Sequence, residues 1–208
     1  MAKVILVNGS PRKNGCTNRA LQEVLDELIK EGVDAEIFWI GYKPIGGCIG
    51  CGTCRTKGSC VFDGDVVEEF LKKAKDADAF VFGSPVYYAG CAGNMKAFLD
   101  RSFYSGGKYL RGKLGAAVVS SRRAGSTSAF DEINKYFTIS EMPIVSSCYW
   151  NEVHGHSAED VEKDEEGLYM MRVLARNMAY LLKCIDAGQK SGVKKEDVGE
   201  HKWTNFIR

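Results

Sequence analysis

Short apolar runs and amphipathic segments alternate along most of this chain. The apolar runs cover residues 3–7, 35–40, 79–83, 114–120 and 144–147, and their length is typical of buried parallel strands. Between and after these runs, apolar side chains recur at spacings of three and four residues, which predicts amphipathic helices. The predicted helices cover residues 21–32, 66–75, 93–103, 126–137 and 165–187.

The alternation gives five strand–helix units, which predict an α/β fold in which helices cover both faces of a parallel sheet. Right-handed crossovers leave few topologies, and a five-stranded, doubly wound, three-layer sheet of flavodoxin type is the leading one. We expect one domain over residues 1–190, with a cysteine-rich loop at residues 44–64. A polar tail, residues 191–208, follows and either dangles or packs its few apolar side chains.

Composition and charge exclude several classes of protein. The chain has 208 residues, of which 45% are hydrophobic and 26% charged, so wholesale disorder is excluded. The 28 basic and 27 acidic residues give a net charge of +1, without a long run of either sign. We therefore expect neither nucleic acid nor a membrane surface as a partner. The apolar runs are far shorter than the roughly 20 residues that span a bilayer, and we expect a cytoplasmic protein.

The first strand ends in a loop that is suited to an anion. Ligands of parallel sheets bind beyond the carboxyl ends of the strands, and residues 9–18 lie there, directly before the first helix. The loop combines a helix N-terminus with hydroxyl, amide and guanidinium groups, which favours a phosphate monoester. The side chains that we assign to this phosphate site are Ser10, Arg12, Asn14, Thr17 and Asn18. The alternative is that Thr17 or Asn14 only caps the helix and that Arg12 is solvated.

Two further strand-end loops are suited to a flat, conjugated ring. Tyr87 and Tyr88 stand among small residues after the third strand, where their rings suit the face of such a ligand better than a solvated turn. Simple packing of the two tyrosines under a loop is the alternative. The fourth strand ends in a polar loop that could serve the ring's polar edge through Ser121, Arg122 and Gly125. A phosphate at the first loop and a ring across the other two is the layout of FMN in a flavodoxin-like fold.

Four of the eight cysteines lie within thirteen positions, at Cys48, Cys51, Cys54 and Cys60. Three thiolates at this close spacing can wrap one corner of a [4Fe–4S] cluster, and a fourth nearby completes the set of ligands. Zinc held by the same four thiolates is a second hypothesis. A folded turn of reduced thiols without metal is the third. Because the loop follows the second strand, we expect it on the flavin side of the sheet.

Three motifs in order resemble the NADPH-dependent FMN reductase family, and within it the iron–sulfur flavoprotein branch. They are residues 9–17, the cysteines of residues 48–60, and residues 84–88 followed by 95–101. The resemblance spans about residues 3–185. It implies a flavodoxin-like fold, bound FMN, transient binding of NAD(P)H, and homodimers or homotetramers in which neighbouring subunits help to wall the flavin.

The same resemblance adds three residues to the two proposed binding loops. Cys16 matches the family's phosphate loop, and Pro85 and Val86 match its isoalloxazine loop beside the two tyrosines. We assign no catalytic side chain, because flavin chemistry needs little from protein acids and bases. His154 and His156 could bind a substrate or donate a proton at the rim, but unpaired loop histidines are typical of polar surface.

The expected function is that of an FMN-dependent oxidoreductase. It would take electrons from NAD(P)H or a reduced carrier and pass them to a small-molecule acceptor, such as a flavin, a quinone or an azo compound. A [4Fe–4S] cluster would add single-electron transfer. A non-catalytic electron carrier like flavodoxin and a cysteine-based metal-binding or redox-sensing protein are the rival hypotheses.

Overall fold

The computed structural model describes residues 1–196, 199 and 204–205 of the chain. In chain order, the elements are β1 (Lys3–Asn8), α1 (Cys16–Lys30), β2 (Asp34–Trp39), α2 (Thr53–Lys57), α3 (Val66–Ala74), β3 (Ala79–Tyr87), β4 (Gly90–Cys91), α4 (Gly93–Leu110), β5 (Leu114–Ser121), α5 (Ser126–Ile139), β6 (Glu152–His154), α6 (Ala158–Val161) and α7 (Glu165–Lys190).

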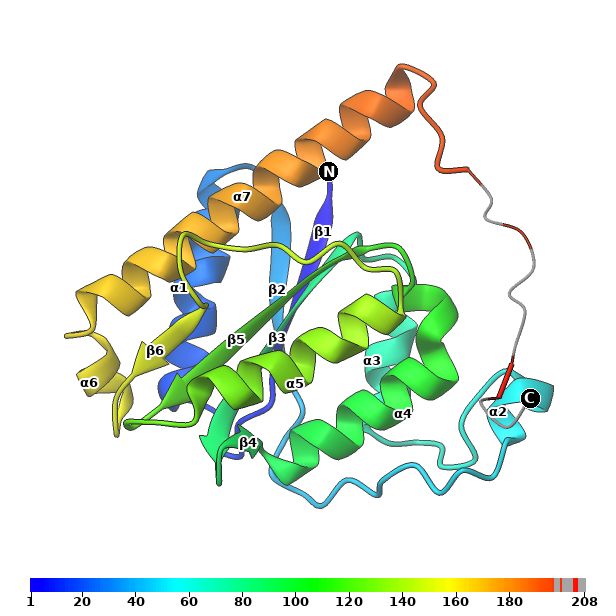
Figure 1. Ribbon diagram of the computed structural model, residues 1–208, viewed down its shortest axis with the longest axis horizontal. Helices are drawn as coiled ribbons and strands as arrows, with labels where there is room; N and C mark the ends of the chain where they lie inside the picture. Colours follow the sequence, from blue (N-terminus) through cyan, green and yellow to red (C-terminus); the bar gives the residue numbers. More distant parts are fainter. Residues whose placement is uncertain (197–198, 200–203, 206–208) are drawn as a thin grey trace.

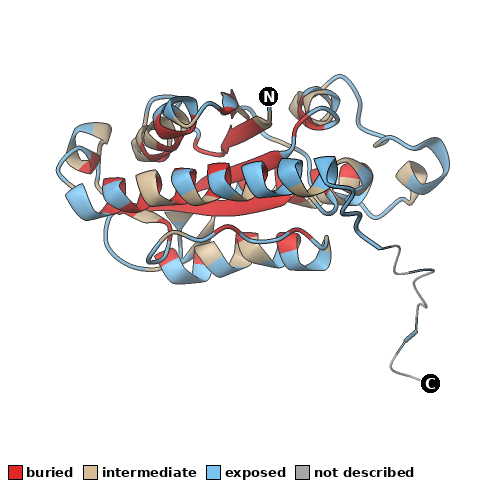
Figure 2. Cartoon of the chain, turned by 90° about the horizontal axis from the view of Figure 1, so that it is seen from above, coloured by how far each residue is buried: buried red, intermediate tan, exposed pale blue. Residues whose placement is uncertain are grey.

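The central sheet has the strand order β2-β1-β3-β5-β6, and every neighbouring pair on this path is parallel. The predicted flavodoxin-type order is therefore confirmed. Helices α1 and α7 cover one face of the sheet, and α3, α4 and α5 cover the other (Figure 1). The buried strands form the middle layer between these helices, whose outer faces are exposed (Figure 2).

The alternation of side chains along β1 explains why both faces need helices. Val4 and Leu6 pack into the core beneath α1 and α7, whereas Ile5 and Val7 pack into the core beneath α3, α4 and α5. All four side chains are fully buried. Each contributes roughly 1.5–3 kcal/mol of transfer free energy when it leaves water. Because side chains alternate between the two faces, a face without helices would expose a continuous apolar surface and lose this contribution.

The predicted fifth strand was placed wrongly. Residues 144–147 make only an isolated bridge between Ile144 and Gly115, and the strand that pairs with the end of β5 is β6. Between the two pairings, the side chain of Asn151 donates from Nδ2 to the carbonyl oxygen of Ala117, 3.0 Å away. A side-chain amide thus satisfies a backbone carbonyl where the edge strand is interrupted, and an apolar pattern cannot indicate such an interruption.

Helix α4 continues well beyond the predicted end at residue 103. The adjacent glycines 106 and 107 suggest a helix end, yet they lie within the helix. A Cβ atom at Gly106 would overlap the side chain of Leu71, so the glycine permits the close packing of α4 on α3. Tertiary packing here outweighs the low helix propensity of glycine.

Helix α7 ends at Lys190, where the predicted tail begins. The tail, residues 191–208, lies partly outside the described residues. Among the helices that the structure describes, none has the length and apolar character to cross a membrane.

Candidate functional site

The loop after β1 is shaped by one buried asparagine. Asn8 donates from Nδ2 to the carbonyl oxygen of Lys13 at 3.1 Å and to Oδ1 of Asn18 at 3.2 Å. Its Oδ1 accepts from the backbone N–H of Ser10 at 3.0 Å. Trp39, at the end of β2, supports the loop from outside by donating from Nε1 to the carbonyl oxygen of Ser10 at 2.7 Å. The loop before α1 therefore has a defined shape without any ligand.

Several of the predicted phosphate ligands make hydrogen bonds within the fold. The Thr17 hydroxyl is buried and lies 2.8 Å from Oγ of Ser120, and Oγ of Ser10 accepts from the backbone N–H of Arg12 at 3.1 Å. The Cys16 thiol donates to the carbonyl oxygen of Gly155 at 3.5 Å, and burial raises its pKa.

The groups that remain open to an anion are on the backbone and at the rim of the loop. The N-cap of α1 is Gly15, and no side chain of the described residues caps this helix. Its first N–H groups and the positive end of its dipole are therefore available to a phosphate. Arg12 and Asn14 are exposed beside them. These features fit the phosphate of FMN.

A tight hairpin joins β3 to β4 and carries the two tyrosines. Tyr87 pairs with Gly90, so Tyr88 and Ala89 form a two-residue turn in which both have positive φ, 50° and 59°. This backbone region is uncommon for residues other than glycine, and such strained positions cluster at ligand sites. Tyr88 is fully exposed at the tip and Tyr87 is about half exposed. Their rings are thus accessible rather than packed under the loop.

The hairpin is held in place by a carboxylate from α5. Glu132 accepts the backbone N–H of Cys91 at 2.8 Å and pairs with the ammonium of Lys96 at 2.7 Å. Burial, followed by the nearby Glu132 carboxylate, raises the pKa of the Cys91 thiol to about 12, so this thiol stays protonated at neutral pH. Cys91 is thereby a packing residue, and Glu132 fixes where the hairpin lies.

The loop after β5 touches this hairpin. Gly125 has a φ of 89°, and a Cβ atom there would lie 2.8 Å from Cα of Ala89. Ser121 is buried, with its Oγ 3.1 Å from Nδ1 of His154, and Arg122 is exposed. The structure therefore brings the three predicted loops to one edge of the sheet, at the carboxyl ends of β1, β3 and β5.

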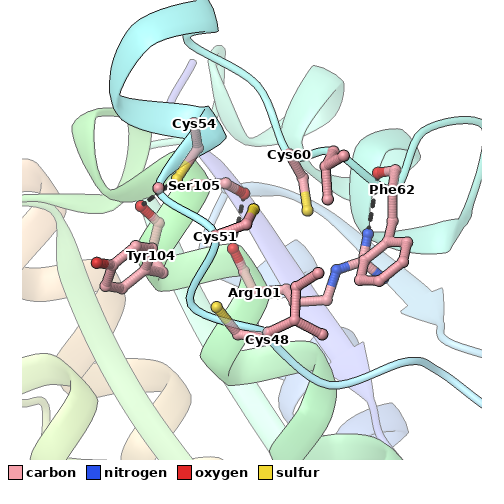
Figure 3. A pocket seen from close by; sticks show the side chains of 11 residues that line it. Cys48, Cys51, Cys54, Cys60, Phe62, Arg101, Tyr104 and Ser105 are labelled. Carbon is pink, nitrogen blue, oxygen red and sulfur yellow. Dashed lines mark hydrogen bonds between the residues drawn. The ribbon is translucent and has the colours of Figure 1, made fainter.

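The four clustered cysteines line a single pocket (Figure 3). All four are free thiols. Side chains of Ile49, Phe62, Arg101 and Tyr104 are among the other residues of the lining. The Thr53 hydroxyl and backbone N–H hold the pKa of the Cys51 thiol below its usual value, which favours the thiolate that metals require.

The pocket lies farther from the strand ends than the sequence predicts. The cysteine loop starts at the carboxyl edge, where Asn94 accepts the backbone N–H of Ile45 at 3.2 Å and donates to the carbonyl oxygen of Lys43 at 2.9 Å. It then follows α4 to Arg101 and Ser105, which line the pocket. At 1.5 Å per residue, the pocket lies roughly 10–16 Å along the helix from Asn94.

The four thiols of the pocket are donors that both zinc and an iron–sulfur cluster bind. Among the described residues, no three His, Cys, Asp or Glu side chains converge closely enough to hold one metal ion. Zinc needs all its sulfur ligands about 2.3 Å from one centre. An iron–sulfur cluster binds each thiolate at a different iron. Four thiols in apolar surroundings provide the donor set of a [4Fe–4S] cluster.

Comparison with known proteins decides the family. Residues 2–157 match the model of the NADPH-dependent FMN reductase family. The chain belongs to this family. An iron–sulfur flavoprotein of Methanocaldococcus jannaschii is 35% identical over 88% of this chain and 98% of its own length. An iron–sulfur flavoprotein of Methanosarcina thermophila is 27% identical over 88% of this chain and 96% of its own length.

The family membership makes this chain a flavin-dependent oxidoreductase, and FMN is the cofactor of the family. A solved structure supports the fold independently. The flavodoxin WrbA-like protein of Agrobacterium tumefaciens superposes with a TM-score of 0.64 at 16% identity, over 88% of this chain and 99% of that one.

Four residues of the site were missed by the sequence analysis. Asn8 could have been found from its position at the end of the first strand. Trp39 and Glu132 gave no such signal, because each acts on a loop that is distant in sequence. Arg101 stood only as the last residue of the motif at 95–101, and its contact with the cysteine loop is likewise distant in sequence. The predicted FMN contacts themselves remain predictions.

Proposed function

We propose that this chain is an iron–sulfur flavoprotein that binds FMN at the carboxyl edge of the sheet and a [4Fe–4S] cluster at the cysteine pocket. The observation that carries the proposal is that Cys48, Cys51, Cys54 and Cys60 line one pocket. Relatives named iron–sulfur flavoproteins, which match nearly their whole length, support it. The four cysteines would be the cluster's ligands, and the cluster would carry single electrons.

The protein's part in the flavin chemistry would be binding and orientation. FMN, when bound, accepts a hydride or single electrons. The N-terminus of α1 and Arg12 would hold its phosphate. The hairpin with Tyr87 and Tyr88 would lie against the ring, and Glu132 would keep that hairpin in place through the N–H of Cys91.

For the donor and the acceptor, we propose NAD(P)H or a reduced carrier and a small-molecule acceptor of flavin, quinone or azo type. Tyr88 stands fully exposed at the rim of the ring site, and a neighbouring subunit of a homodimer or homotetramer would cover it. The rival assignment as a simple carrier differs in one measurable respect. A carrier exchanges electrons with protein partners and shows no steady oxidation of NAD(P)H with these acceptors.

The test compares cysteine variants after anaerobic purification. Cys51→Ser is expected to lower iron and acid-labile sulfide to a small fraction of the wild-type content, while FMN remains bound. Cys184→Ser, an exposed thiol on α7 away from the pocket, is the matched control and is expected to change neither.

Two outcomes would separate the proposal from its alternatives. Equal iron and sulfide in wild type and Cys51→Ser would exclude Cys51 as a ligand. Bound zinc without sulfide would show that the pocket takes a single ion instead.

A further inference from the structure

One arginine lies beneath the cysteine pocket and holds both ends of the cysteine loop. The Arg101 side chain is 1% exposed. Its Nη2 donates to the carbonyl oxygen of Phe62 at 3.1 Å, and its Nη1 donates to Asp65 and, at 3.5 Å, to the carbonyl oxygen of Gly46. Gly46 precedes the first cysteine of the loop and Phe62 follows the last. The two terminal nitrogens therefore tie the loop to α4.

The guanidinium also interacts with the Cys60 thiol of the pocket. Arg101 Nε is buried, and no oxygen or nitrogen atom of the described residues accepts a hydrogen bond from it. A buried donor on a charged group is strongly destabilising when it lacks an acceptor. Arg101 also lines the cysteine pocket, and it is the one charged side chain among the described lining residues. The acceptor that suits Nε therefore lies among the sulfur atoms of the pocket.

An iron–sulfur cluster would supply such an acceptor. Four thiolates bring four negative charges, and cluster sulfurs accept hydrogen bonds. The cluster becomes one charge more negative when it takes up one electron. A nearby cation and an N–H donor both stabilise that reduced form more than the oxidised form, and therefore raise the reduction potential.

We propose that Arg101 is a positioning residue for the cluster, whose Nε–H hydrogen-bonds a cluster or cysteine sulfur and whose charge raises the cluster's reduction potential. The inference rests on the proposed function, because it needs the cluster at Cys48, Cys51, Cys54 and Cys60. It adds that Asp65 opposes the effect, since this carboxylate is paired with the same guanidinium.

A purely structural role for Arg101 makes a different prediction, and a pair of variants distinguishes the two. Arg101→Gln removes the positive charge, and Asp65→Asn removes the negative charge from the same ion pair. Asparagine can still accept the N–H groups of Val67 and Glu68 that Asp65 caps at the start of α3. Both variants loosen the same contact, but only an electrostatic role moves the potential in opposite directions.

The experiment is an anaerobic redox titration with dithionite and mediator dyes, followed by electron paramagnetic resonance on the holoprotein. We expect Arg101→Gln to lower the cluster's potential by at least a tenfold shift in the ratio of oxidised to reduced cluster, about 59 mV for one electron. Asp65→Asn is expected to raise it. Arg172→Gln, which breaks an ion pair with Glu23 between α7 and α1, is the control and is expected to leave it unchanged.

Unchanged potentials, or shifts of the same sign in both variants, would overturn the role of Arg101 while leaving the proposed function intact. In the case that Arg101→Gln loses its cluster, two other variants decide the role of Arg101. They are Asp65→Asn and Arg101→Lys, and the latter keeps the positive charge but lacks the Nε–H. Wild-type protein without iron and sulfide after reconstitution would refute the proposed function, and this inference with it.

Discussion

Replacing Gly125 with alanine tests whether two strand-end loops form one flavin site. Gly125 is the N-cap of α5 and has a φ of 89°, and it lies against the tip of the β3–β4 hairpin. An added Cβ atom would lie 2.8 Å from Cα of Ala89, 2.9 Å from its Cβ and 3.3 Å from Cγ1 of Val86. Because Cα of Ala89 is backbone, the hairpin itself must move.

The energetic cost of Gly125→Ala has two parts. Alanine in the left-handed region costs about 1–2 kcal/mol relative to glycine. Forcing an extra carbon into a packed contact adds typically about 1–3 kcal/mol. The sum, about 2–5 kcal/mol, is shared between lost stability and displacement of the hairpin. If 1.4 kcal/mol or more falls on the flavin site, the affinity for FMN falls at least about tenfold.

The assay is titration of the apoprotein with FMN, followed by the quenching of flavin fluorescence, with thermal unfolding measured in parallel. Gly32→Ala is the matched control, because Gly32 has a φ of 77° and a Cβ atom there would meet nothing within 4 Å. The control should lose about 1–2 kcal/mol of stability and keep its FMN affinity.

An FMN affinity of Gly125→Ala equal to that of wild type, with a loss of stability like that of Gly32→Ala, would refute the reasoning. In that case, the contact between Gly125 and Ala89 would not shape the flavin site.

Two further changes test the core that supports the site. Thr17→Val removes the buried hydroxyl that pairs with Ser120 and should lower the free energy of unfolding by about 1–3 kcal/mol in urea titrations; an unchanged value would contradict a role for this hydrogen bond. Burial opposes the ionisation of Glu27, but the ion pairs that Glu27 makes with Lys30 and Arg176 outweigh the effect of burial and lower the pKa of its carboxyl group. The contribution of these ion pairs to the free energy of unfolding is fully present above the unfolded-state pKa of about 4.3. It is lost as the pH falls through the lower folded-state pKa. The destabilisation of Glu27→Gln, about 1–3 kcal/mol at pH 7, should therefore shrink below about pH 4, and a difference that is independent of pH would contradict the assignment.

The pattern of apolar runs was enough to predict the sheet, because burial on both faces leaves a clear mark on a strand such as β1. The error at residues 144–147 has a physical origin. An edge strand needs fewer apolar residues, and here the side chain of Asn151 replaces part of the backbone pairing. Helix α4 continues past its predicted end at residue 103 for a similar reason, since the packing of Leu71 against Gly106 is a tertiary contact.

The site was predictable where a general rule applies and unpredictable where distant contacts decide. The rule that ligands bind at the carboxyl ends of parallel strands placed the three loops correctly at one edge. It could not show that the Thr17 hydroxyl bonds to Ser120, because that pairing joins residues far apart in sequence. The role of Arg101 escaped notice because it depends on the folding of the cysteine loop back onto α4.

The most direct test of the central claim is the composition of anaerobically purified wild-type protein, with FMN, iron and acid-labile sulfide measured on one sample beside its visible spectrum. The account predicts one FMN, four irons and four sulfides per chain, and flavin bands on a broad shoulder that bleaches on reduction. FMN without iron or sulfide, before and after anaerobic reconstitution, would contradict the cluster and leave a flavin reductase with a structural cysteine loop.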